Sequence, residues 1–172
     1  MSSRREAEFP PIAQLLPQAG AARLLERVLA HDGVETRCAV DPSQSALYRD
    51  ASGRVPAWVA LEYMAQCAAA DGSLRGRAGG LPREPALLIG SRRVTFRSAG
   101  FDATQRLEVT ARHAAGQREL LAFDCAVFDA RGGEPLAEGR LNVLPLRGHA
   151  LSAVSTSLAF GSRRPPSGHS PR

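Results

Sequence analysis

The chain has 172 residues, of which 44% are apolar and 23% charged, so it suits one globular domain and is neither disordered nor fibrous in composition. Three cysteines lie far apart with no Cys-x-x-Cys spacing, which argues against a disulfide framework or a zinc site and suits a reducing cytoplasm. The net charge of +5 does not indicate nucleic-acid binding. Residues 148–172 contain three arginines and no acidic residue, so the rest of the chain carries a net charge of only +2.

The two ends of the sequence differ from its middle. Residues 1–10 form a short polar arm without the apolar stretch of a secretory signal. Residues 148–172 end in a segment rich in Pro, Ser, Gly and Arg that cannot bury apolar surface. No apolar run approaches the ~20 residues that a membrane-spanning helix needs. We therefore expect a flexible N-terminal arm, one folded domain over residues 11–147 and a disordered tail, in a cytoplasmic protein without a membrane span.

The first part of the domain predicts a short helix and two strands. Residues 12–16 form one helical turn that Pro17 ends, and residues 22–29 predict a strand that turns at residues 31–33. Residues 34–40 alternate apolar and polar side chains, which is the pattern of a half-buried strand. A loop over residues 41–53 follows.

Residues 56–75 predict one long buried helix. Pro56 suits the first helical position, where its missing N–H would have no partner in any case. The Ala-rich stretch after it contains no Gly or Pro as far as residue 70 and is apolar nearly all round, which indicates burial on every face. We expect the helix to end near Asp71 and Gly72, before a Gly-rich loop.

Four further strands are predicted after this loop, and the turns between them carry glycine. They lie at residues 86–96, 106–112, 120–128 and 135–144. Two strands, one long buried helix and four more strands predict an α+β fold in which an antiparallel sheet of about five to six strands wraps around the helix.

Glu62 places a carboxylate in an otherwise apolar helix, and this position needs an explanation. A buried carboxylate is costly unless it is hydrogen-bonded, shifted in pKa or beside a cavity, and Gln66 lies four residues further on the same helix face. Glu62 either reaches solvent or an arginine, or it acts as a general acid in an apolar site. The backbone N–H of Ala57 lies at the positive end of the helix, where a thioester carbonyl is well accommodated.

The residues around this helix start resemble a known family. Residues 53–66, Gly-Arg-Val-Pro-Ala-Trp-Val-Ala-Leu-Glu-Tyr-Met-Ala-Gln, resemble the helix signature of the 3-hydroxyacyl-[acyl-carrier-protein] dehydratases: Gly-His-Phe-Pro, a spacer, Pro-Gly and Glu/Asp-Ala-x-Ala-Gln. Residues 15–28 resemble the start of that family, and Pro-Ala-Trp-Val-x-x-Glu-Tyr-Met-Ala-Gln is most similar to the branch associated with aryl polyene biosynthesis. The resemblance spans residues 11–145 in matching order.

This resemblance implies a hotdog fold and the removal of water from a 3-hydroxyacyl thioester, in a dimer or pseudodimer. The acyl chain would lie in a tunnel along the helix. An acyl carrier protein would deliver it on phosphopantetheine, which arrives with the substrate, so no separate cofactor is expected. By resemblance, Glu62 is the acidic catalytic residue, Gln66 supports it, and the Ala57 N–H binds the thioester carbonyl. We place Trp58 with the substrate-binding residues.

The sequence departs from the family at its catalytic histidine. Tyr48 stands near that position, and Gln18 replaces the second histidine of the motif. The four histidines of the chain lie at positions 31, 113, 149 and 169, away from the positions of the family base.

Three explanations for this departure remain open. Tyr48, Asp50 or a partner residue serves as the base; the chain is an impaired accessory subunit of a heterodimer; or it binds or hydrolyses a thioester. We expect a homodimer or a heterodimer with a paralogous dehydratase.

Arginines are frequent in the loop and strand after the helix. Arg93 and Arg97 would share one face of the predicted strand and would there form a docking patch for an acidic carrier protein. The alternative is a solvated surface without a partner. Cys67, on the helix, is expected to be a small core residue.

Overall fold

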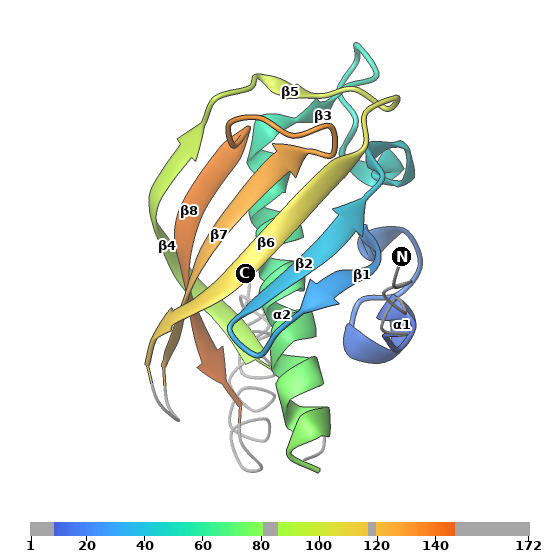
Figure 1. Ribbon diagram of the computed structural model, residues 1–172. Helices are drawn as coiled ribbons and strands as arrows, with labels where there is room; N and C mark the ends of the chain where they lie inside the picture. The colour runs from blue at the N-terminus through green and yellow to red at the C-terminus, as the bar shows by residue number, and fades with distance from the viewer. Residues whose placement is uncertain (1–8, 81–85, 117–119, 147–172) are drawn as a thin grey trace, which may run out of the picture.

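The computed structural model describes residues 9–80, 86–116 and 120–146, and at its centre one long helix lies against a six-stranded antiparallel sheet (Figure 1). The strand order is β1-β2-β6-β7-β8-β4. The strands are β1 (Leu25–His31), β2 (Glu35–Val40), β6 (Leu107–Ala115), β7 (Leu121–Asp129), β8 (Ala137–Pro145) and β4 (Ala86–Phe96). The predicted α+β hotdog fold is therefore confirmed. Most of the predicted arm, and the predicted tail, lie outside the described residues.

Helix α2 (Ala60–Ala78) differs from its prediction at both ends. Pro56 lies in the short strand β3 (Val55–Pro56), which pairs with β5 (Gly100–Phe101), and a 3₁₀ turn over Ala57–Val59 leads into the helix. The helix does not end at Asp71 and Gly72 but continues to Ala78. A glycine within a helix costs about 1 kcal/mol relative to alanine, and the contacts of Asp71 described below outweigh that cost.

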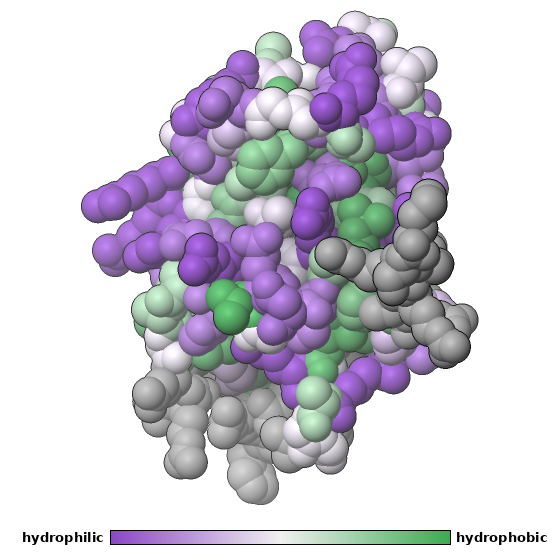
Figure 2. Space-filling view, in the orientation of Figure 1, coloured by the Kyte–Doolittle hydropathy of each residue, from purple (hydrophilic) through white to green (hydrophobic). Residues whose placement is uncertain are grey.

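The core lies between α2 and the inner face of the sheet. Alternate residues of each strand point toward the helix, as in Cys38, Val109 and Leu141, which are all fully buried. The opposite face of the sheet is largely hydrophilic with a few apolar patches (Figure 2). The sheet covers only one side of α2, so the prediction of burial on every face is wrong. Partly exposed positions run along its other side: Leu61, Glu62, Ala65 and Ala69.

The remaining elements place the loops around the start of α2. Helix α1 (Ile12–Leu15) is the predicted single turn, and a 3₁₀ turn over Gly20–Ala22 precedes β1, so the first strand begins later than predicted. The predicted loop after β2 contains two 3₁₀ turns, Pro42–Gln44 and Ala46–Tyr48. None of the helices among the described residues is long and apolar enough to span a membrane.

Candidate functional site

Gln66 joins the middle of α2 to the chain segment that enters β1. Its side chain is fully buried, and its Oε1 accepts a hydrogen bond from the Leu24 N–H at 2.9 Å. Its Nε2 donates to the Ala22 carbonyl and to Glu62 Oε1, both at 2.8 Å. The amide group is therefore fixed on both sides, and this fixes the position of the Glu62 carboxylate.

Trp58, Glu62 and Gln66 are spaced by four residues and lie along one side of the helix start. Trp58 is 54% exposed, and Tyr48 packs edge-on against it with ring centroids 5.8 Å apart. The neighbouring Leu47 is 67% exposed. The structure thus brings Tyr48 and Trp58 together and places a half-buried carboxylate on the same side of the helix, beside exposed apolar surface.

The loop that carries Tyr48 is anchored on the helix by Tyr63. The hydroxyl groups of Tyr63 and Ser45 form a buried hydrogen bond of 2.9 Å. Burial raises the pKa of Tyr63 to about 12, against a smaller opposing effect of that hydrogen bond. Tyr63 therefore stays protonated at neutral pH and acts as a fixed support of the loop.

The backbone N–H of Ala57 is not free. It donates to the Ala99 carbonyl at 3.2 Å, beside the pairing of β3 with β5, so the prediction that it is open to a thioester carbonyl is wrong. The next N–H, of Trp58, has no acceptor within its own helical turn because the first N–H groups of a helix lack one.

Among the described residues, only Gln66 is hydrogen-bonded to the Glu62 carboxylate, and no candidate base is. Asp50 accepts three hydrogen bonds within its own turn, two of them from Ser52, and these lower its pKa. Gln18, in the second histidine position, has a buried Oε1 without a hydrogen-bond partner among the described residues. His113 stacks edge-on against Phe123, with ring centroids 5.6 Å apart.

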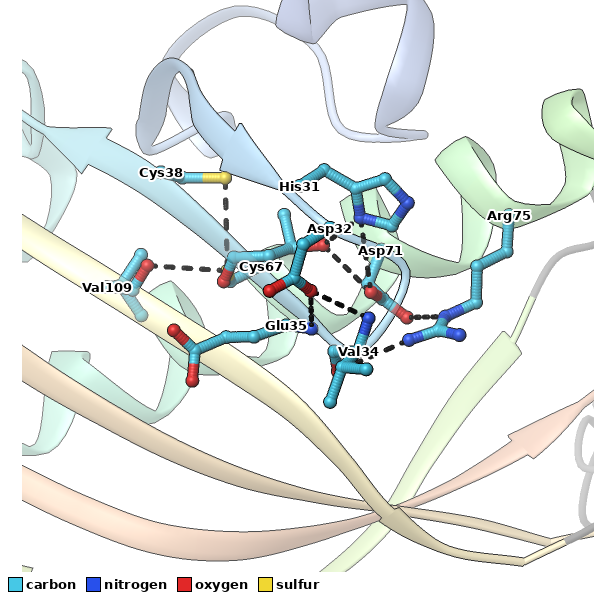
Figure 3. Close-up of polar contacts among 10 residues, drawn as sticks. His31, Asp32, Val34, Glu35, Cys38, Cys67, Asp71, Arg75 and Val109 are labelled. Atoms are coloured by element: carbon cyan, nitrogen blue, oxygen red, sulfur yellow. Dashed lines mark hydrogen bonds and ion pairs between the residues drawn. The ribbon is translucent and has the colours of Figure 1, made fainter.

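His31 belongs to a second polar cluster, around Asp71, that was not predicted (Figure 3). Asp71 is fully buried, its Oδ1 accepts from Thr36 Oγ1 at 2.8 Å, and its Oδ2 accepts from Arg75 Nε at 2.6 Å. His31 Nδ1 lies 2.8 Å from Thr36 Oγ1 and 3.6 Å from Asp71 Oδ1. The spacing of Asp71 and Arg75, four residues apart on a helix, was the sequence signal for this pair.

The Asp71 cluster ties the second half of α2 to the hairpin of β1 and β2. Asp71 lies nine residues after Glu62, which is about 13 Å along a helix, so the two carboxylates belong to different sites. Both oxygens of Asp71 are engaged by protein groups, and Arg75 also donates to the Val34 carbonyl at 3.3 Å. Cys67, one turn before Asp71, is fully buried, as predicted for a small core residue.

Arg93 and Arg97 do not form the predicted stripe. The pairing of β4 with β8 shifts register between Arg92 and Thr95, and Arg93 has a φ of 54°, so the regular alternation is lost there. Arg97 lies just beyond β4 and is engaged by Glu138 at 2.6 Å. Arg93 is exposed and has no ion-pair partner among the described residues.

The comparisons with known proteins agree with this geometry. The model of the ApeP-like proteins, described as ApeP dehydratase, matches residues 10–153, and no curated protein matches the chain. The dehydratase heterocomplex ApeI:P from Xenorhabdus doucetiae is similar in structure, with a TM-score of 0.79 and 21% identity over 86% of this chain and 99% of that one.

More distant structures share the same fold. Cj0977, a sigma28-regulated virulence protein from Campylobacter jejuni, has a TM-score of 0.60 and 15% identity over 82% of this chain and 90% of that one. PaaI of the phenylacetic acid degradation operon of E. coli has a TM-score of 0.54 and 11% identity over 69% and 81%. At such identities the structural likenesses bear on the fold alone, whereas the family match spans most of the sequence. The chain belongs to the ApeP-like dehydratase family.

Proposed function

We propose that this chain is the acid-bearing subunit of a heterodimeric dehydratase that removes water from 3-hydroxyacyl thioesters on an acyl carrier protein. The observation that carries the proposal is the fixed position of Glu62, whose carboxylate Gln66 holds through a buried amide bound to the Ala22 and Leu24 backbone. A general acid must stand in one place relative to the leaving group, and this contact supplies that constraint.

The reaction needs two proton transfers. A base takes the proton from the carbon next to the thioester carbonyl, and the electron pair left there forms the new double bond. The bond from the next carbon to its hydroxyl group breaks, and Glu62, entering the cycle protonated, gives its proton to that oxygen so that it leaves as water. The Trp58 N–H, at the positive end of the helix, stabilises the negative charge that develops on the thioester carbonyl oxygen.

The base comes from the second subunit. His31 lies in the Asp71 cluster, about 13 Å along the helix from Glu62. Oδ1 of Asp50 accepts three hydrogen bonds within its own turn. Tyr48 carries a phenol hydroxyl group, and a phenol that holds its proton is a poor acceptor for a second one. A histidine of the partner chain suits the task because its ordinary pKa is near 6.5.

The substrate reaches this site on the exposed apolar surface beside Glu62. Trp58 is 54% and Leu47 67% exposed, and both flank the helix start, where an acyl chain would cover them. Phosphopantetheine arrives as part of the substrate, so the chain itself needs no cofactor. The neighbouring structure from Xenorhabdus doucetiae is a complex of two dehydratase chains, which supports a paired arrangement here.

The test is the formation of enoyl product. The purified chain is incubated with 3-hydroxyacyl-carrier protein, alone and with the paralogous dehydratase of the same organism, and products are read by mass spectrometry. We expect enoyl product from the mixture, and a loss of about 10²- to 10⁴-fold in rate for Glu62→Gln. Glu26→Gln, at an exposed position of β1, is the matched control and retains the rate.

Three results would overturn the proposal. Equal rates for wild type and Glu62→Gln would remove Glu62 from the chemistry. Full activity of the chain alone, abolished by Tyr48→Phe, would place the base in this chain and not in a partner. Release of free acid in place of enoyl product would identify a thioesterase.

A further inference from the structure

A cavity of about 920 Å³ opens on the outer face of the sheet, over the neighbouring strands β4, β8 and β7 (Figure 1). On β7 it is lined by Ala122 and Asp124. These two residues alternate with Phe123 and Cys125, which are buried on the inner face toward α2. The sheet therefore separates this cavity from the helix and from Glu62.

The cavity has a shallow floor because small residues cross it. Gly90, Asn142 and Ala122 stand opposite one another on β4, β8 and β7. A Cβ added at Gly90 would have open space around it. Two residues before Ala122, Leu120 lies on the same face and is 45% exposed, so the floor has an apolar wall on that side.

The opposite wall is charged, and its acids are already paired within the protein. Arg140 donates two hydrogen bonds, of 2.7 and 2.8 Å, to the carboxylate of Asp124. The hydrogen bond from Arg140 holds the pKa of Asp124 below its usual value, so this carboxylate stays charged at neutral pH. Glu138, the other acid of the lining, is paired with Arg97 at 2.6 Å. Neither acid remains to balance a further arginine.

A bulge in β4 brings two more arginines to this cavity. Consecutive residues of a regular strand point to opposite faces, so Arg93 would face α2 if Arg92 faces outward. The pairing instead shifts between Arg92 and Thr95, and Val94 takes the inner position, since a Cβ on the opposing Gly139 would lie 3.0 Å from Val94 Cγ2. Arg93 is thus the inserted residue, and it lines the same cavity as Arg92.

The backbone of Arg93 is strained in this position. Its φ of 54° lies in the left-handed region, which a Cβ disfavours and which glycine adopts freely. Glycine is accordingly the usual residue at such a position of a bulge. Strain of this kind gathers at sites that bind ligands, and Arg92 and Arg93 have no ion-pair partner among the described residues. The chain therefore keeps a guanidinium group where its backbone favours glycine.

We propose that this cavity binds an organic phosphate, whose phosphate group contacts Arg92 and Arg93 and whose apolar part lies against Leu120. A phosphate monoester carries a charge close to −2 at neutral pH, which two guanidinium groups match, and each of them can donate paired hydrogen bonds to it. The amide of Asn142, on the floor, donates and accepts hydrogen bonds for the rest of the ligand. The cavity lies on the far side of the sheet from Glu62, so the proposal does not depend on the dehydration reaction.

Charged residues and bulges also protect edge strands from pairing with other chains. That role needs only a charge at the edge of β4, and it accounts neither for a cavity nor for two guanidinium groups lining it together. It predicts that the protein binds phosphates equally well with and without these two side chains.

The test is isothermal titration calorimetry of the full-length chain with phenyl phosphate and with inorganic phosphate, at neutral pH and at one ionic strength set with sodium chloride. We expect Arg92→Gln and Arg93→Gly each to weaken the binding of phenyl phosphate by about tenfold or more, because each removes charge-assisted hydrogen bonds. Arg27→Gln, at an exposed position of the opposite edge strand, removes the same charge and leaves the dissociation constant unchanged.

Arg93→Gly separates binding from folding. Glycine suits the φ of 54°, so the melting temperature of the ligand-free variant should equal or exceed that of wild type while its binding falls, a combination that unfolding cannot produce. Dissociation constants for Arg92→Gln and Arg93→Gly that equal that of Arg27→Gln would overturn the proposal, as would no binding of either phosphate to wild type. We expect phenyl phosphate to bind more tightly than inorganic phosphate, and equal binding of the two would overturn the role of the apolar wall.

Discussion

The amide of Gln66 holds three groups at once, and Gln66→Met removes all three contacts together. Methionine matches glutamine in length and volume, is unbranched and keeps a high helix propensity, so it removes the polar contacts without opening a large cavity. The Leu24 N–H then has no acceptor, the Ala22 carbonyl loses a donor, and Glu62 is no longer held.

The three losses differ in size because the groups differ in burial. Leu24 is 1% exposed, so its unpaired N–H costs about 1–3 kcal/mol. Ala22 is exposed, and water replaces the lost donor at almost no cost. Glu62 is half-buried, so the loss of its hydrogen bond to Gln66 lowers the free energy of unfolding by about 0.5–1 kcal/mol. Allowing for the greater hydrophobicity of methionine, we expect a net loss of about 2 kcal/mol in the free energy of unfolding.

The assay is urea unfolding followed by circular dichroism, with Glu62→Gln measured beside Gln66→Met. Glu62→Gln keeps an oxygen that accepts from Gln66 Nε2, so its free energy of unfolding should stay within about 0.5 kcal/mol of wild type. A loss below about 0.5 kcal/mol for Gln66→Met would refute the reasoning, because it would mean that the Leu24 N–H is not buried against this amide.

Three further predictions concern the buried side chains of Asp71, the cysteines and Tyr63. Asp71→Asn removes the charge that pairs with Arg75 and should lower the free energy of unfolding by about 2 kcal/mol in urea titration, less than a fully buried pair would lose because Arg75 reaches solvent. All three cysteines are buried, so Ellman's reagent should react with them only after unfolding. In a Tyr48→Phe variant the phenolate absorbance of Tyr63 should appear at about pH 12. Because unfolded tyrosine ionises near pH 10, the stability that Tyr63 contributes is present below that pH and is lost as the pH rises through about 12.

The sequence patterns predicted the fold because its signals were local. The alternation in residues 34–40 and the Ala-rich run after Pro56 each identify an element from adjacent residues alone. The four later strands begin and end within a few residues of their predictions because turns with glycine bound them. Glu62 and Gln66 were also paired correctly, since a spacing of four residues on a helix brings side chains together.

The sequence predictions are wrong where a contact with a segment distant in sequence determines the local structure. The sequence predicts that α2 ends near Asp71 and Gly72, before a Gly-rich loop, but Thr36, from β2, donates a hydrogen bond to Asp71 inside the fold and the helix continues to Ala78. The Ala57 N–H was expected to be free, but the Ala99 carbonyl, 42 residues further along the chain, accepts from it. No pattern near either position reports these contacts.

Two surfaces of this molecule are not covered by any other element among the described residues. The partly exposed side of α2, where Glu62 lies, has no sheet over it, and β4 has neither a strand at its edge nor a helix over it among the described residues. A Glu62 carboxylate without a function would not need to be held by the buried amide of Gln66. Glu62 is instead held by Gln66, and among the described residues no candidate base is hydrogen-bonded to it, which agrees with the proposed two-subunit reaction. A second subunit that covers this side of the helix would supply the base, so the proposed reaction should run only in the mixture of the two chains.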